Sequence, residues 1–104
     1  MNTPLTLSTS RSRAGEPTLT AVGEIDLSNV GEFNAALDAA MTTDSRLTVD
    51  LTGVEYLDSA ALACLFAHVD DVRITANPLL ESVLRISGLA DMAPVTIAEP
   101  AAGD

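Results

Sequence analysis

The stretch RLTVDLTGVEYLDSAALACLFAHV, residues 46–69, decides the fold because it joins a strand pattern to a capped helix pattern. Residues 46–51 alternate between polar and apolar side chains, which predicts a short strand that ends before Thr52-Gly53. Asp58-Ser59 then supplies a helix N-cap. Beyond the cap, apolar residues recur at i, i+3, i+4 and i+7 and predict one buried helix face; they are Leu62, Leu65, Phe66 and Val69.

Strand alternation and helical spacing also occur on both sides of this stretch. Alternation predicts strands at 5–9 and 19–22, joined at Gly15-Glu16-Pro17, with a break at Gly23. Helical spacing predicts a helix at 30–41, opened by a capping box of Asn29 and Glu32. Three further elements are expected: a strand at 72–75, a helix from Pro78 to a stop at Gly88, and an edge strand at 95–98.

This order of elements predicts an α/β fold. Strands that alternate with helices form a mixed sheet, here of 4–5 strands with about three helices, covered on at least one face. At 104 residues the chain has room for one domain, expected at 1–98, and a frayed, disordered tail at 99–104.

The charge balance restricts the partners. Fifteen acidic residues against five basic ones give a formal net charge of -10, which repels nucleic acid and anionic membranes and favours a basic protein partner; equally, the charge serves solubility. There is one cysteine, no secretory start and no apolar run near the about 18 residues of a membrane span. We expect a cytoplasmic protein.

The sequence offers no complete catalytic or metal centre. His68, its one histidine, follows Ser59 by nine positions on the same predicted helix, which puts the two about 13 Å apart and about 180° around the axis. Ser59 therefore has no general base. Cys64 and His68 form an i, i+4 pair without a second ligand cluster, so packing is the favoured reading. We expect no enzyme activity, no metal and no cofactor.

What remains is the Asp58-Ser59 cap and the helix behind it. On physical grounds alone, either Asp58 or Ser59 merely caps the helix, a contribution of about 1 kcal/mol. The helix face that carries Ala60, Ala63 and Ala67 is small rather than charged. Such a helix is either buried on both sides or presents a docking surface.

Four segments together resemble the STAS domain family, named for sulfate transporters and anti-sigma factor antagonists. They are Gly23-Glu24-Ile25-Asp26, then Val49-Asp50-Leu51 followed by Tyr56-Leu57-Asp58-Ser59, then Asn77-Pro78, and Ile86-Ser87-Gly88-Leu89. The resemblance covers nearly the whole chain. It implies a small sheet with helices packed mainly against one face.

The resemblance also implies a function. Free-standing members bind an anti-sigma factor that is also a serine kinase, which frees a sigma factor, and phosphorylation of the Ser or Thr after the motif Asp ends the binding. That residue is Ser59 here. Asp26 matches an acidic position that helps to engage the kinase, although capping together with Ser28 and Asn29 explains it equally well. The implied partner-binding residues are Asp26, Ser28, Asn29, Asp58, Ser59, Ala60, Ala63 and Ala67.

Two departures keep other functions open. The connection from the second helix to the fourth strand, residues 68–72, is shorter than is usual in the family, so that helix is expected to end early. Family members commonly follow the motif with Ser or Thr and then Gly, whereas this chain has Ala60-Ala61, which stiffens the turn that a kinase would approach. The alternatives are an accessory subunit of a membrane transporter, and a binding or sensing module that is never phosphorylated.

Overall fold

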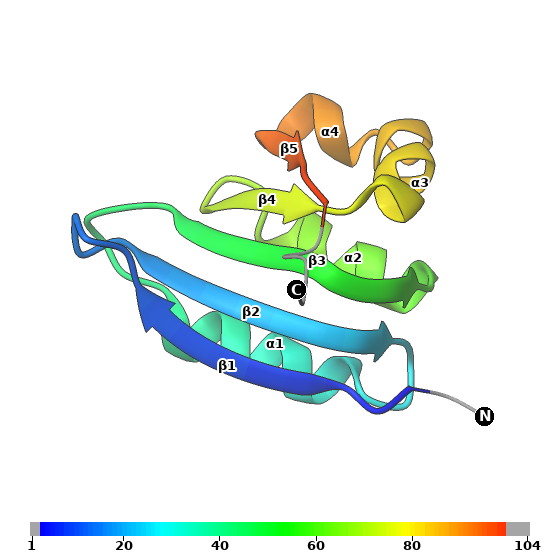
Figure 1. The fold of residues 1–104 in the computed structure, drawn as a ribbon, viewed down its shortest axis with the longest axis horizontal. Helices are drawn as coiled ribbons and strands as arrows, with labels where there is room; N and C mark the ends of the chain where they lie inside the picture. The colour runs from blue at the N-terminus through cyan, green and yellow to red at the C-terminus, as the bar shows by residue number, and fades with distance from the viewer. Residues whose placement is uncertain (1–2, 100–104) are drawn as a thin grey trace.

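Five strands form one sheet in the order β1-β2-β3-β4-β5 (Figure 1). The structure is a computed structural model that describes residues 3–99. β1 and β2 are antiparallel, and the pairs from β2 to β5 are parallel. The strands are β1 (Thr6–Arg11), β2 (Pro17–Ile25), β3 (Leu47–Leu57), β4 (Val72–Ala76) and β5 (Val95–Ile97). The mixed five-stranded sheet confirms the predicted fold class.

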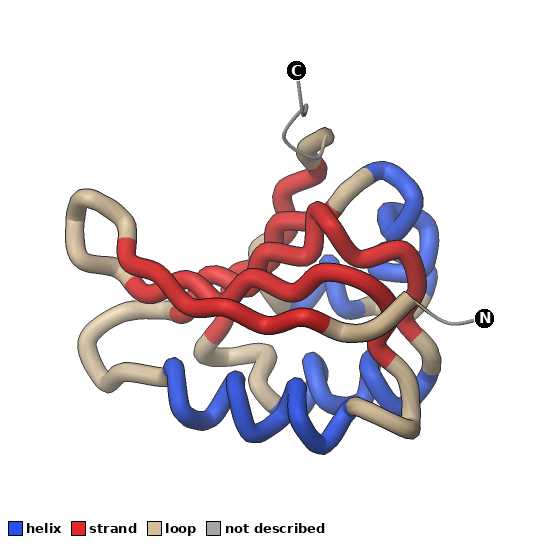
Figure 2. The backbone as a smooth tube through the Cα atoms, turned by 60° about the horizontal axis from the view of Figure 1, so that its bottom comes forward, coloured by secondary structure: helices blue, strands red, loops and turns tan. Residues whose placement is uncertain are grey.

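The helices leave one face of the sheet open. They are α1 (Val30–Ala40), α2 (Ser59–Ala67), a 3-10 turn η1 (Pro78–Leu80), α3 (Glu81–Ile86) and α4 (Leu89–Met92). Figure 2 shows α1 running along one side of the strands. Leu19, Val49 and Ile74 pair across β2, β3 and β4 and are buried, whereas the next row, with Thr20 and Asp50, is only half-buried.

The core lies between the sheet and the helices. Phe33 and Leu37 of α1 are fully buried, as their helical spacing predicts. On α2 the most buried residues are Leu65 and Ala61, while Leu62 is only half-buried. The predicted face of α2 is therefore shifted, because the methyl side chain of Ala61 is small enough to sit fully inside the core.

Two predicted strand ends were wrong. β2 continues through Gly23 to Ile25: this glycine has a φ of 110°, and the N-terminal segment crosses so closely that a Cβ would lie 2.1 Å from the Pro4 carbonyl oxygen. β3 continues past Thr52-Gly53 to Leu57, because two register shifts against β2 absorb extra residues without ending the pairing.

The C-terminal third also differs in detail. The single helix expected from Pro78 begins as η1 and becomes α3, and the short helix α4 after Gly88 was not predicted. Gly88 has a φ of 90°, so it separates the two helices as a left-handed stop. The predicted tail at 99–104 lies, from residue 100 on, outside the described residues. Within residues 3–99, no helix is long and apolar enough to cross a bilayer.

Candidate partner-docking site

Three loops meet at the edge of the sheet where the parallel strands end. Each strand from β2 to β4 is followed there by a polar residue at a helix entry: Asp26 after β2, Asp58 after β3 and Asn77 after β4. In open α/β sheets, ligands and partners commonly bind at this edge because loops from separate strands come together there. Every sequence-predicted site residue lies on the first two loops or on α2.

Asp58 holds two of these loops together. Its Oδ1 accepts the Ala61 N–H at 2.9 Å, which caps α2, and its Oδ2 accepts the Leu27 N–H at 2.9 Å. The Asp58 N–H in turn donates to the Ile25 carbonyl at 3.2 Å. One carboxylate thus fixes the start of α2 against the loop between β2 and α1.

Ser59 is the first residue of α2, and its side chain is exposed. Among residues 3–99 its hydroxyl has no hydrogen-bond partner, because Asp58 already supplies the cap. Of the pair Asp58-Ser59, which the sequence predicted as the helix cap, Asp58 is therefore the residue that caps α2. The Ser59 hydroxyl is left available to an approaching partner.

The loop between β2 and α1 has its own internal hydrogen bonds. Asp26 Oδ1 accepts both the N–H and the hydroxyl of Ser28. Asn29 Oδ1 accepts the Asp26 N–H, and its Nδ2 donates to the Glu24 carbonyl, each at 2.9 Å. The predicted capping box is wrong: Asn29 is the N-cap of α1 but makes no side-chain cap bond, because its amide is used within the loop.

The same loop exposes an apolar residue that sequence reasoning missed. Leu27 is 78% exposed although the Asp58 carboxylate fixes its backbone. An exposed leucine whose backbone is fixed gives a protein partner apolar area to bury. The available signal was a leucine among polar turn residues that belongs to no helical or strand period.

The alanine face of α2 is exposed rather than buried on both sides. Ser59, Ala63 and Ala67 are exposed at spacings of four residues, and Ala60 beside them is half-buried. Together with Leu27 they form a surface of small and apolar side chains, which we call the Ser59 surface. Its members are Asp26, Leu27, Ser28, Asp58, Ser59, Ala60, Ala63 and Ala67.

Charge is unevenly distributed between the two edges of the sheet. Four of the five basic residues lie at the edge where the parallel strands begin, beside acidic residues of the turns there: Arg11, Arg13, Arg46 and Arg73. The fifth, Arg85, is in the last turn of α3. The opposite edge carries carboxylates on or next to the strand ends and helix entries; they are Glu24, Asp26, Glu32, Glu55, Asp58 and Glu81. The Ser59 surface therefore sits in an acidic rim, which favours a basic partner.

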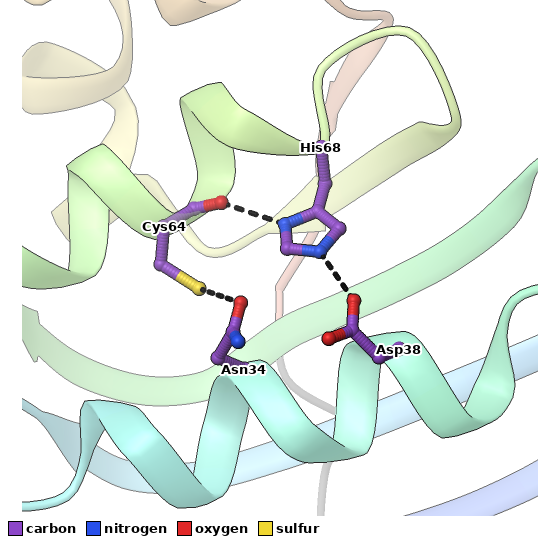
Figure 3. Close-up of polar contacts among 4 residues, drawn as sticks. All are labelled: Asn34, Asp38, Cys64 and His68. Atoms are coloured by element: carbon purple, nitrogen blue, oxygen red, sulfur yellow. Dashed lines mark hydrogen bonds and ion pairs between the residues drawn. The ribbon is translucent and has the colours of Figure 1, made fainter.

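A separate polar cluster joins α1 to α2 (Figure 3). His68 Nε2 lies 2.9 Å from Asp38 Oδ1, and its Nδ1 lies 2.8 Å from the Cys64 carbonyl oxygen. The Cys64 thiol contacts Asn34 Oδ1 at 3.4 Å. Within the described residues, no group of three or more potential ligands could hold a metal ion.

His68 has an altered pKa because of these neighbours. Burial by itself lowers the pKa of the imidazole, but the Cys64 carbonyl, the Asp38 carboxylate and the charge of Asp71 outweigh burial and raise it. For Cys64, burial and the nearby Asp38 charge raise the pKa of the thiol. His68 caps the C-terminal end of α2, whereas Ser59 begins the helix, so the two lie at opposite ends as the spacing predicts.

Comparison with known proteins identifies the family to which this fold belongs. The family model described as "Mlab, STAS domain" matches residues 8–96. The chain belongs to the STAS domain family. The family predicted from the four sequence segments is thereby confirmed, and no curated protein matches the sequence.

Solved structures agree with this STAS assignment. An anti-sigma factor antagonist from Mycobacterium paratuberculosis is 24% identical, with a TM-score of 0.80 over 89% of this chain and 86% of that one. A protein of Shewanella loihica with a SpoIIAA-like fold is 15% identical, with a TM-score of 0.64 over 95% and 89%. An antisigma-factor antagonist STAS domain from Rhodobacter sphaeroides is 16% identical, with a TM-score of 0.52 over 69% and 84%. At these identities the likeness establishes a shared fold.

Proposed function

We propose that this STAS domain is an anti-sigma factor antagonist that binds an anti-sigma factor with serine kinase activity through the Ser59 surface. Binding releases the sigma factor, and phosphorylation of Ser59 ends the binding. The observation that carries the proposal is the free, exposed Ser59 hydroxyl at the start of α2, beside a cap that Asp58 supplies alone.

The chemistry of the surface supports a protein ligand. Leu27 offers an exposed apolar anchor, and Ala63 and Ala67 allow another backbone to approach closely. The surrounding carboxylates attract a basic partner and speed its association. A catalytic role has less support, because His68 lies at the far end of α2 and is engaged by Asp38.

Phosphorylation would weaken the complex through the charge that it adds at Ser59. A phosphate on Ser59 adds about -1.5 to -2 charge next to Asp58, in a rim that is already acidic. The helix N-terminus tolerates a phosphate, so the fold persists. A partner surface that fits a neutral hydroxyl and an alanine face would have to desolvate that charge, and the complex weakens.

The test is binding and phosphorylation with the candidate anti-sigma factor kinase of the source organism. We expect ATP-dependent phosphate transfer to the wild type and none to Ser59→Ala. Ser59→Glu should lower the affinity by roughly 10- to 100-fold, or about 1.4 kcal/mol per tenfold. The matched control is Thr43→Glu, an exposed residue in the α1–β3 loop at the other sheet edge, which should bind as the wild type does.

Two results would contradict the proposal. One is the absence of phosphate on Ser59 together with unchanged binding by Ser59→Glu. The other is co-purification with a membrane ATPase or permease instead of a kinase, which would assign the domain to a transporter as an accessory subunit.

A further inference from the structure

The outer edge of β1 is a second feature of the fold that invites a partner. β1 ends the sheet order and, within residues 3–99, pairs with β2 alone, so one side of a six-residue strand has no partner among these residues. The other edge strand, β5, has only three residues. Proteins commonly protect a long edge strand with charged side chains, proline or a bulge; β1 has no proline or bulge, and its one charged side chain, Arg11, stands at its last position.

The hairpin register shows which groups face outward. The Ser12 N–H donates to the Glu16 carbonyl at 2.8 Å, and hydrogen-bonded and non-hydrogen-bonded pairs alternate along an antiparallel ladder. Ser12 is a bonded position, so Leu7, Thr9 and Arg11 direct their N–H and C=O groups away from β2. These groups can pair with another strand without disturbing the hairpin.

A groove of about 700 Å³ opens beneath this edge. β1 and the start of β2 form one wall, and the C-terminal half of α1 forms the other. The helix contributes Ala36, Ala39 and Ala40, whose methyl side chains leave the space unfilled. Because Leu7 and Thr9 also line it, the groove lies on the side to which inward-facing side chains of an added strand would point.

We infer that a second copy of this chain occupies the edge, through antiparallel pairing of the two β1 strands. A two-fold axis at Ser8 places Ser8 opposite its symmetry mate and Leu7 opposite the partner subunit's Thr9. In this register, the outward groups of Leu7 and Thr9 form the hydrogen-bonded pairs. The partner subunit's Leu7 then points toward the groove beside Ala36 and Ala39, and the two sheets become one ten-stranded sheet.

Charge complementarity favours a second copy. No acidic residue occurs before Glu16, so two chains of net charge -10 can meet here without placing one carboxylate against another. Antiparallel pairing brings Arg11 of one copy to the end where the partner's α1 begins. Glu32 lies in the first turn of α1, and its i, i+4, i+7 spacing puts it on the same side of the helix as Ala36 and Ala39. Arg11 of one copy and Glu32 of the partner subunit therefore attract each other.

This inference stands apart from the proposed function. The β1 edge belongs to the hairpin side of the sheet, whereas the Ser59 surface is built from the β2–α1 loop and α2. A dimer formed through β1 would carry two Ser59 surfaces. The result of either test leaves the other proposal standing.

Cysteine cross-linking tests the predicted axis in a Cys64→Ser background. Directly opposite residues of a non-hydrogen-bonded pair have Cα atoms about 4.5 Å apart, within the about 4.4–6.8 Å that a disulfide spans. Ser8→Cys should therefore give a disulfide-linked dimer under mild oxidation. Thr96→Cys, on the exposed face of β5, is the matched control: it should still dimerise through β1 but give no disulfide-linked dimer.

A proline substitution tests the hydrogen bonds. Thr9→Pro removes an outward N–H that β2 does not use, so the far-UV circular dichroism should stay unchanged while the dimer dissociation constant rises by about tenfold or more. Light scattering after size exclusion measures that constant. A wild type that is monomeric up to millimolar concentration would overturn the inference, and so would a dimer that Thr9→Pro leaves intact or that Ser8→Cys fails to cross-link.

Discussion

At the scale of single residues, Asp58 is the most exacting position because one carboxylate accepts two backbone N–H groups. Asp58→Ala should destabilise the domain by roughly 1–2 kcal/mol, the loss of an N-cap and of the bond to Leu27. Urea unfolding measures this. Asp70→Ala, an exposed carboxylate in the α2–β4 turn, should change stability by less than about 0.5 kcal/mol; an equal loss in both variants would refute the role of Asp58.

Two glycines should respond in opposite directions to the same substitution. Gly23→Ala places a methyl group 2.1 Å from the Pro4 carbonyl oxygen at a φ of 110°, and should cost about 2 kcal/mol or more. Gly31→Ala meets nothing within 4 Å on α1, and should stabilise by about 0.5–1 kcal/mol. Thermal unfolding of the two variants gives the comparison, and shifts of the same sign would contradict it.

At the scale of elements, Asn77 joins the bulged part of β3 to η1. Its Nδ2 donates to the Thr52 and Val54 carbonyls at 2.9 and 2.7 Å, and its Oδ1 accepts the Leu79 N–H at 2.8 Å. Because Asn77 is buried, Asn77→Ala leaves these groups without partners and should cost about 2–4 kcal/mol. Asn29→Ala, whose amide lies in a half-exposed loop, should cost distinctly less in the same urea series.

The contact between α1 and α2 should depend on pH through His68. Its pKa is raised in the fold above the ordinary value of 6.5, since the Cys64 carbonyl, Asp38 and Asp71 outweigh the lowering effect of burial. Folding therefore favours the protonated imidazole. Its contribution is complete below about pH 6.5 and is lost as the pH rises through the folded-state pKa.

The matching experiment compares wild type with Asp38→Asn at about pH 6 and about pH 9. The stability difference should be larger at the lower pH, because the carboxylate attracts the charged imidazole more strongly than the neutral one. Asp70→Asn is the control, because Asp70 neighbours Asp71 but is not among the groups that raise the pKa of His68. The difference in stability between wild type and Asp70→Asn should therefore be the same at both pH values. A difference that grows with pH would contradict the assignment.

At the scale of the whole molecule, the acidic rim around the Ser59 surface should make partner binding sensitive to salt. Raising the ionic strength from about 0.05 to about 0.3 M should slow association several-fold, because screening removes the long-range attraction of a basic partner. Asp26→Asn should flatten this dependence, whereas Asp44→Asn at the opposite edge should not. Association rates from surface plasmon resonance provide the test, and equal slopes for both variants would refute it.

Sequence periodicity predicted most of the elements but not how they end. The 3.6-residue period found α1 and α2 because Phe33, Leu37 and Leu65 face one core. It missed the continuation of β2 through Gly23, since the reason for that glycine is a chain crossing at Pro4, nineteen positions away along the sequence. It also missed Leu27, whose backbone N–H is held by a carboxylate thirty-one residues away.

The sequence by itself determined the family, the order of strands and helices, the separation of Ser59 from His68 and the overall acidity. These properties follow from local patterns and residue counts. Only the tertiary structure decided that Asp58 caps alone, that Leu27 and the alanine face are both exposed, and that four of the five arginines lie at the far edge of the sheet. The physical reason is that these properties arise between segments. Parallel pairing of β2, β3 and β4 brings separate loops to one edge, and no local period records which side chains meet there.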